Sequence, residues 1–407
     1  MKIPHLDFVK KAFMLGTGNA IGQAIAFVFF VLLARWMSRD DYGEIRYIIS
    51  LSSVLGTVAL AGLPASMTRF LAYQKEKEER EKYFTNIMTL FFMTLMIMGL
   101  IVIALFSNSL TITIVLMGFT VPLIYLGAIR GLMQYRKYSI FQALRNLIKL
   151  AFLFAIFYTI GVKKLPVLLI YSFAGWGAML ILELVWPAGM RFTPGRISKD
   201  VMKRVIAFSI PVMGTTIAYS LFTGLPVLLT TYYKGYESAA VYSTAFTFTA
   251  IYSLVPTAIL TMIMPKIASI RDKESRMQIF KSSVYLILMA GALLFIATVF
   301  FGKWGLNLLF HSKYDSSYMP LVILSLGTIF LSVRGAYSAL WEGGGRPIIS
   351  TYDGVGAVTV MAMLGPLIIP SMGANGAALA FTAGCITAVI ISTYFWMQLK
   401  KGKIELK

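Results

Sequence analysis

Twelve long apolar segments occupy most of this chain and leave only short polar gaps between them. Hydrophobic residues make up 58% of its 407 positions. A helix that crosses the hydrocarbon core of a membrane needs about 20 apolar residues, so this composition is sufficient for about twelve crossings. The sequence therefore predicts an all-α integral membrane protein. We expect membrane-spanning helices at 12–35, 43–68, 83–106, 110–134, 139–161, 165–189, 204–232, 238–265, 279–301, 317–341, 347–370 and 373–398.

The lysines and arginines are sorted between alternate gaps. With a cytoplasmic amino terminus, 26 of the 37 lie in cytoplasmic gaps and termini. Such a bias in short loops fixes the orientation of a membrane protein. We therefore expect a multi-pass protein of the plasma (cytoplasmic) membrane with both termini in the cytoplasm. Seven basic residues fall on the opposite side: Arg35, Arg39, Lys163, Lys164, Lys234, Lys303 and Lys313. The net charge of +20 is then explained by topology and lipid contact rather than by nucleic acid binding.

The residue inventory argues against several kinds of site. Cys385 is the single cysteine, which excludes a disulfide or a cysteine metal cluster within one chain. The two histidines, His5 and His311, are too few for a histidine-rich zinc site. The loops are short and carry no nucleotide-binding motif. We expect no catalytic residue, metal or cofactor, so the protein is not expected to be an enzyme. A membrane glycosyltransferase or polymerase is the weaker alternative.

A faint internal repeat divides the chain into two halves. At a spacing of 196 residues, "RFLA" (69–72) aligns with "PKIA" (265–268), and Arg46 aligns with Tyr242. Six helices in each half place both halves in the same orientation, as a parallel repeat about an axis along the membrane normal. We expect an amino-terminal lobe at 1–195 (helices 1–6) and a carboxy-terminal lobe at 196–407 (helices 7–12).

Two stretches resemble a known family. Residues 16–72, with "YGEIRY" (42–47) entering the second helix, resemble the start of Wzx-type polysaccharide biosynthesis flippases. These belong to the multidrug/oligosaccharidyl-lipid/polysaccharide (MOP) exporter superfamily. "SAAVYSTAFTFTAIYSLVPTAILTMIMPKIAS" (238–269) is similar to the eighth helix of that family. The chain departs from peptidoglycan-precursor flippases, which carry two extra helices, and from drug exporters, which place acidic residues in the first lobe.

The resemblance implies two six-helix lobes in a V-shaped, MATE-like fold that works by alternating access. It implies a flippase that moves a lipid-linked oligosaccharide diphosphate from the cytoplasmic to the outer leaflet for cell-surface polysaccharide biosynthesis. The expected partners are that substrate, membrane lipids and a coupling ion, H⁺ or Na⁺, and the protein is expected to be a monomer. A cation-coupled drug or metabolite antiporter on the same fold is the alternative.

Four cations lie inside predicted spans: Arg46, Arg145, Lys149 and Arg334. A cation at the centre of a membrane helix costs roughly 2.5–3.5 kcal/mol, so it faces a polar cavity or a partner. Arg145 and Lys149 share one helix face, where like charges repel unless an anion lies between them. They are candidate substrate-binding residues. Alternatively, Glu183 neutralises one of them, or both reach the cytoplasmic interface.

Each of the other candidate residues allows a functional and a structural interpretation. Arg46 is a substrate-binding candidate or an interfacial anchor paired with Glu44 or Asp41. Arg334 is a substrate contact or the structural partner of Asp353, which is itself a candidate ion-coupling residue. Asn19 and Gln23 bind substrate or pack beside the small residues of their helix. Arg69 and Arg130 either capture the headgroup of the substrate or contribute only to the orientation of the chain in the membrane.

Overall fold

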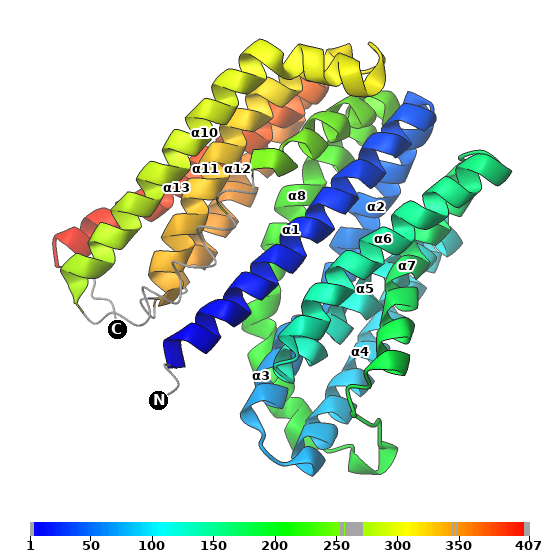
Figure 1. The fold of residues 1–407 in the computed structure, drawn as a ribbon, viewed down its shortest axis with the longest axis vertical. Coiled ribbons are helices and arrows are strands. Elements are labelled where there is room, and N and C mark those ends of the chain that lie inside the picture. Colours follow the sequence, from blue (N-terminus) through cyan, green and yellow to red (C-terminus); the bar gives the residue numbers. More distant parts are fainter. Residues whose placement is uncertain (1–3, 253–255, 257–271, 344–345, 347, 403–407) are drawn as a thin grey trace. The chain divides into compact units, whose positions relative to one another are not determined.

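A computed structural model describes residues 4–252, 256, 272–343, 346 and 348–402 of the chain. The described residues form helices joined by short turns and contain no strand. The elements are α1 (Pro4–Trp36), α2 (Arg39–Leu60), α3 (Leu63–Tyr73), α4 (Lys77–Leu105), α5 (Ser109–Gly131), α6 (Tyr135–Thr159), α7 (Lys164–Val185), η1 (Pro194–Arg196), α8 (Lys199–Phe248), α10 (Lys273–Phe310), η2 (Asp315–Ser317), α11 (Tyr318–Gly343), α12 (Ile348–Met372) and α13 (Ala374–Lys400) (Figure 1).

Eleven helices among the described residues are long and apolar enough to cross a membrane. The helix α8 spans 50 residues, about 75 Å at 1.5 Å per residue, which exceeds one crossing. Gly235 interrupts it with φ 76°, a backbone conformation that glycine adopts readily. This break separates the predicted spans 204–232 and 238–265, although residues 253–255 and 257–265 lie outside the described residues. The predicted all-helical membrane fold is confirmed.

One predicted span is not a single continuous helix, so that prediction is wrong. The sequence predicts a continuous helix at 43–68, but α2 ends at Leu60 and α3 begins at Leu63. Ala61 and Gly62 between them have φ of 47° and 74°. Helices often end in this left-handed conformation, and a proline near the first position of the next helix restarts it. The sequence "AGLP" therefore breaks the helix despite its apolar composition.

The described chain divides into two compact units. Unit 1 comprises 1–16, 30–47 and 225–407, and unit 2 comprises 17–29 and 48–224. The long helices α1, α2 and α8 contribute residues to both units. The predicted lobe boundary at 195/196 stays a prediction.

Unit 2 is built around α3, α5, α6 and α7, with α6 beside α7 (Figure 1). Small residues allow close approach of these helices, as is usual in membrane proteins. A Cβ on Gly127 of α5 would lie 2.6 Å from the carbonyl oxygen of Pro64 on α3. A Cβ on Gly118 would lie 2.5 Å from the Cβ of Ser172 on α7. This packing brings α5 close to both α3 and α7.

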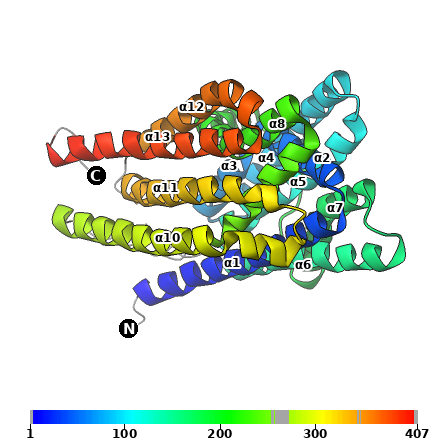
Figure 2. The same ribbon diagram turned by 90° about the horizontal axis from the view of Figure 1, so that it is seen from above.

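Unit 1 contains α10–α13, with α11 packed beside α13 (Figure 2). Trp341 and Leu340 of α11 are fully buried in an apolar cluster with Phe280 of α10 and Leu399 of α13. The cluster lies near the carboxy-terminal ends of α11 and α13. Ile349 of α12 belongs to it as well, so the cluster joins four helices of this unit by apolar contact.

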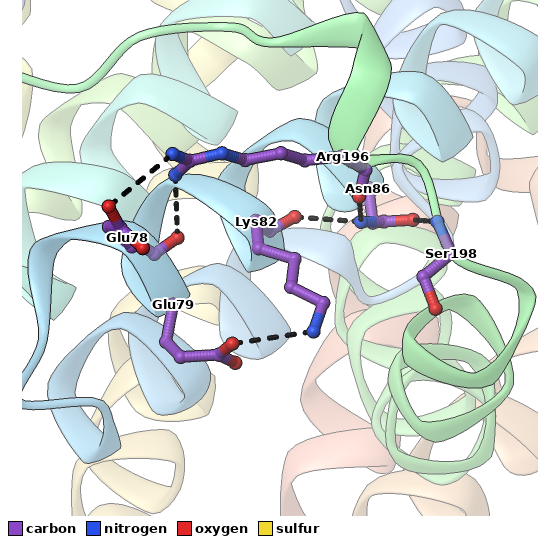
Figure 3. Close-up of polar contacts among 6 residues, drawn as sticks. All are labelled: Glu78, Glu79, Lys82, Asn86, Arg196 and Ser198. Atoms are coloured by element: carbon purple, nitrogen blue, oxygen red, sulfur yellow. Dashed lines mark hydrogen bonds and ion pairs between the residues drawn. The ribbon is translucent and has the colours of Figure 1, made fainter.

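The connection between α7 and α8 is bound to the start of α4 by polar contacts (Figure 3). Arg196 forms an ion pair with Glu81 at 3.1 Å, and the buried side chain of Asn86 bonds the backbone of 196–198. Thr85 accepts a hydrogen bond from the N–H of Thr193 at 3.1 Å. These contacts place the whole connection in unit 2.

Candidate functional site

Arg145 and Lys149 lie one turn apart on α6, as their spacing predicts. Lys149 is buried, with its Nζ 4.3 Å from the centre of the Tyr171 ring on α7. The guanidinium of Arg145 lies 5.9 Å from the centre of the Phe141 ring. Gly175 of α7 faces the Arg145 side chain, since a Cβ there would lie in ordinary contact with Arg145 Cδ at 3.5 Å. The two cations thus face α7 over a lining of aromatic rings.

This cationic pair has no carboxylate partner in the described part of the chain. The Arg145 Nε is buried without a hydrogen-bond acceptor. Cation–π contacts contribute only about 0.5–2 kcal/mol, well below the cost of burying an unpaired charge. Two like charges one turn apart also repel each other. The arrangement of these two cations therefore indicates an anion-binding site.

Glu183 does not neutralise either cation of this pair, and that alternative was wrong. Its carboxylate accepts hydrogen bonds from Lys137 Nζ, from the Tyr125 hydroxyl at 2.6 Å and from the Ala188 N–H at 2.8 Å. Lys137 is completely buried and also donates to the carbonyl of Trp186 at 2.6 Å. By sequence, Lys137 counts among the cytoplasmic loop cations. The structure instead makes it the partner of the carboxylate, which leaves Arg145 and Lys149 uncompensated.

Asn19 lies on α1 where this helix packs against α6. Its Oδ1 accepts a hydrogen bond from Gln142 Nε2 at 3.3 Å. One turn away, Asn146 Nδ2 donates to the carbonyl of Gly22 at 2.8 Å. The polar residues of this face thus join two helices beside the cationic pair. Gln23, further along α1, is exposed.

Arg46 belongs to unit 1, whereas the cationic pair belongs to unit 2. Its guanidinium lies 4.5 Å from the centre of the Phe30 ring, and its Nε is buried without a hydrogen-bond acceptor. Among the described ion pairs, none joins Arg46 to Asp41 or Glu44. The interpretation of Arg46 as an interfacial anchor stays a prediction.

Arg334 and Asp353 form an ion pair between α11 and α12, with Arg334 Nε 2.7 Å from Asp353 Oδ1. The second carboxylate oxygen accepts a hydrogen bond from Ser392 on α13 at 2.6 Å. Asp353 is completely buried. Both oxygens are engaged, so a coupling cation would have to replace Arg334 or Ser392.

Arg69 and Arg130 are both exposed near the ends of their helices. The Arg69 guanidinium lies 4.3 Å from the centre of the Phe208 ring. That of Arg130 lies 5.1 Å from the centre of the Tyr138 ring. Each side chain thus rests on an aromatic face with its charge open to solvent, an arrangement common at membrane interfaces.

The prediction from sequence missed three features of the site. Tyr171 lines it from α7, but a single tyrosine in an apolar span gives no distinct signal. Gly175 faces Arg145 from α7, which only the packing of the two helices shows. The pairing of Lys137 with Glu183 was hidden because Lys137 stands beside two other loop cations, Arg130 and Arg136.

Solved structures define the fold class. The lipid II flippase MurJ in an inward closed conformation superimposes with a TM-score of 0.76 at 12% identity, covering 95% of this chain and 87% of that one. An inward-facing MATE-family multidrug resistance transporter of the MOP superfamily gives 0.71 at 13% identity, covering 96% and 98%. The chain therefore has the fold of MOP-superfamily transporters and is a multi-pass membrane protein.

The sequence comparisons are more specific. Residues 8–271 match the profile of the family described as polysaccharide biosynthesis protein, so the chain belongs to that family. The chain is also 22% identical to the capsular polysaccharide biosynthesis protein CapF of Staphylococcus aureus, over 96% of its own length and all of that protein. The resemblance on residues 16–72 and 238–269 is thus confirmed.

Proposed function

We propose that this protein is a flippase for a polyprenyl-diphosphate-linked oligosaccharide. It moves its substrate from the cytoplasmic to the outer leaflet of the plasma membrane by alternating access, with both termini in the cytoplasm. The family, its capsular relative and the flippase fold support this function. The single observation that carries it is the uncompensated cationic pair Arg145–Lys149 in unit 2.

The pair suits a diphosphate for physical reasons. Arginine donates through a planar fork that matches phosphate oxygens, while lysine supplies a compact charge. A bound anion would satisfy the buried Arg145 Nε and relieve the repulsion between the two cations. Arg46 and Arg334 serve as further contacts in unit 1, and Asn19 and Gln23 serve the glycan. Arg69 and Arg130 capture the headgroup at the cytoplasmic surface.

No covalent step is needed for this transfer, so the protein acts without catalytic residues. We further propose that it acts as a monomer. Its energy comes from a gradient of H⁺ or Na⁺, from the membrane potential or from consumption of the product. Asp353 is the candidate coupling residue. For it to act so, loss of the Arg334 contact must free a carboxylate oxygen for the ion.

The competing function is a cation-coupled drug or metabolite antiporter. Such a protein needs a free carboxylate near its substrate, because the cargo is a cation. In unit 2 the carboxylate that lies within a span near the pair, Glu183, already accepts from Lys137 and Tyr125. Export of cationic dyes by the wild-type protein would favour the antiporter.

The test is transport of a labelled polyprenyl-diphosphate glycan between the leaflets of reconstituted vesicles. We expect the Arg145→Ala, Lys149→Ala double variant to lose at least about tenfold in rate, since two charge-assisted contacts are removed. Arg136→Gln, which removes an exposed cation from the same helix, is the matched control and should transport normally. Transport that survives in the double variant would remove this site, and absence of transport by the wild type would remove the function.

A further inference from the structure

A second group of basic side chains gathers in unit 1, where the end of α1 and the start of α2 meet the segment between α10 and α11. We call Arg35, Arg39, His311 and Lys313 the basic corner. Arg35 Nη2 lies 2.5 Å from His311 Nε2, and Arg39 Nη2 donates to the carbonyl of Lys313. Residues 276 positions apart in the sequence thus lie in contact here.

Lys313 has a structural task in this corner. Its Nζ donates to the carbonyls of Ala34, at 2.8 Å, and Met37. These are among the last carbonyls at the end of α1, where a cation compensates the negative end of the helix dipole. Burial, and then the nearby charge of Arg39, lower the pKa of the Lys313 ammonium. The lysine is therefore occupied by the backbone and crowded by a second cation.

The two arginines keep donors for a further partner. Arg35 is exposed, and Arg39 is half-buried with its guanidinium 5.7 Å from the centre of the Tyr314 ring. Among the described ion pairs, none joins either arginine or Lys313 to a carboxylate, although Asp40 and Asp41 stand in the first turn of α2. No ion pair among the described residues thus occupies the remaining donors of Arg35 and Arg39.

Topology gives no reason for this charge. Arg35, Arg39 and Lys313 are three of the seven basic residues that the positive-inside pattern assigns to the outer side, where basic residues are disfavoured. In the structure these three residues lie close together. At the outer interface of a membrane, the anion within reach of exposed guanidinium groups is the phosphate of a lipid, which arginine binds through two parallel hydrogen bonds.

We propose that the basic corner binds the phosphate group of a lipid in the outer leaflet. Arg35 and Arg39 donate to the phosphate oxygens, while Lys313 holds the end of α1 in place beneath them. The lipid is a phospholipid or the glycan-carrying lipid diphosphate after transfer, since both present the same anion. The inference rests on the proposed orientation of the protein and not on its transport activity.

Native mass spectrometry of the purified full-length protein tests this inference. Phosphatidylglycerol and a polyprenyl diphosphate are titrated separately, with zwitterionic phosphatidylcholine for comparison. We expect the Arg35→Gln, Arg39→Gln double variant to lose at least about tenfold in affinity for one or both anionic lipids. The lipid that is lost identifies the source of the phosphate. Lys163→Gln, Lys164→Gln removes two other cations assigned to the outer side and should leave both affinities unchanged.

The outcomes are distinct from those of the transport assay. An equal loss in both double variants indicates general surface charge and overturns the site, as does unchanged binding in Arg35→Gln, Arg39→Gln. If the unfolding temperature shows that the double variant is damaged, Arg35→Gln alone decides. Arg35 is exposed, and its side-chain partner in the described structure is His311. Lipid binding by this corner is measured without any transport, so a failed flippase assay does not affect it.

Discussion

The side chain of Asn86 on α4 accepts a hydrogen bond from the backbone N–H of Ser198 at 2.8 Å (Figure 3). The same amide donates to the carbonyl of Arg196 at 3.0 Å and to that of Lys82 at 2.7 Å. Asn86 is completely buried, and its side chain satisfies three partly buried backbone groups. The connection between α7 and α8 is therefore anchored to α4.

Removing this amide should destabilise the protein. Asn86→Ala leaves partly buried backbone groups without partners, and about 1–3 kcal/mol for each is the upper limit of the cost. We expect a lower unfolding temperature in detergent. Asn108→Ala is the matched control, because Asn108 is exposed and its side chain does not cap α5. Equal unfolding temperatures for the two variants would show that the Asn86 contacts are not important for stability.

The anchoring also predicts that this connection does not move during transport. Thr85 Oγ1 and Thr193 Oγ1 lie 3.4 Å apart, so cysteines at both positions should form a disulfide on oxidation. The pair is introduced into a Cys385→Ala background, which otherwise lacks cysteine. We expect the oxidised protein to transport as well as the reduced one. A loss of transport that a reductant reverses would show that the connection moves.

The ion pair of Lys137 and Glu183 should contribute to stability rather than to transport. Breaking a buried pair from one side costs about 3–5 kcal/mol, and the value here is lower because Glu183 keeps 34% of its side chain exposed. We expect Lys137→Met to lower the unfolding temperature, and Lys137→Met, Glu183→Leu to restore part of it. A double-mutant cycle measures this coupling. If the two effects simply add, the pair is not coupled.

Much of the fold follows from the sequence, because each crossing needs its own long apolar segment. Ten of the twelve predicted spans lie within a single described helix or nearly coincide with one. The course of 43–68 failed because hydropathy does not detect a break at Ala61–Gly62, where backbone conformation decides. The segment 238–265 is described only in part. Helix ends also shifted, and α10 continues to Phe310, well past the predicted end at 301.

The candidate site was predictable in its cations but not in their partners. The spacing of Arg145 and Lys149 places them on one face of any α-helix. Whether a carboxylate pairs with them depends on the packing of α5, α6 and α7. In the structure Glu183 pairs with Lys137 instead. The same limit applies to Arg334: its place in the sequence allows a substrate contact or a pair with Asp353, and only the packing of α11 against α12 shows the pair.

Asp353 offers a test of ion coupling. Asp353→Asn keeps the shape of the side chain but removes its charge, leaving Arg334 unpaired. If Asp353 carries the coupling ion, transport by this variant should no longer respond to a gradient of H⁺ or Na⁺ across the vesicle. Ser392→Ala is the comparison, because it removes one hydrogen bond and keeps the carboxylate. A full gradient response in Asp353→Asn would leave Asp353 a structural residue.

Gly175 should control the geometry of the cationic pair. A Cβ at this position of α7 would lie 2.5 Å from Pro122 Cγ on α5 and 3.5 Å from Arg145 Cδ, so the helices must separate to accept it. We expect Gly175→Ala to cost about 1–3 kcal/mol by overpacking and to weaken binding of a polyprenyl diphosphate. Gly177→Ala is the matched control, because it makes the same substitution on the same helix. Its Cβ would meet only Ile148 Cδ1, at 3.9 Å, so it should be neutral or stabilise by up to about 1 kcal/mol through helix propensity. Unfolding temperature and lipid binding are measured for both, and equal behaviour of the two variants would show that the contact of α7 with Arg145 and Pro122 does not shape the site.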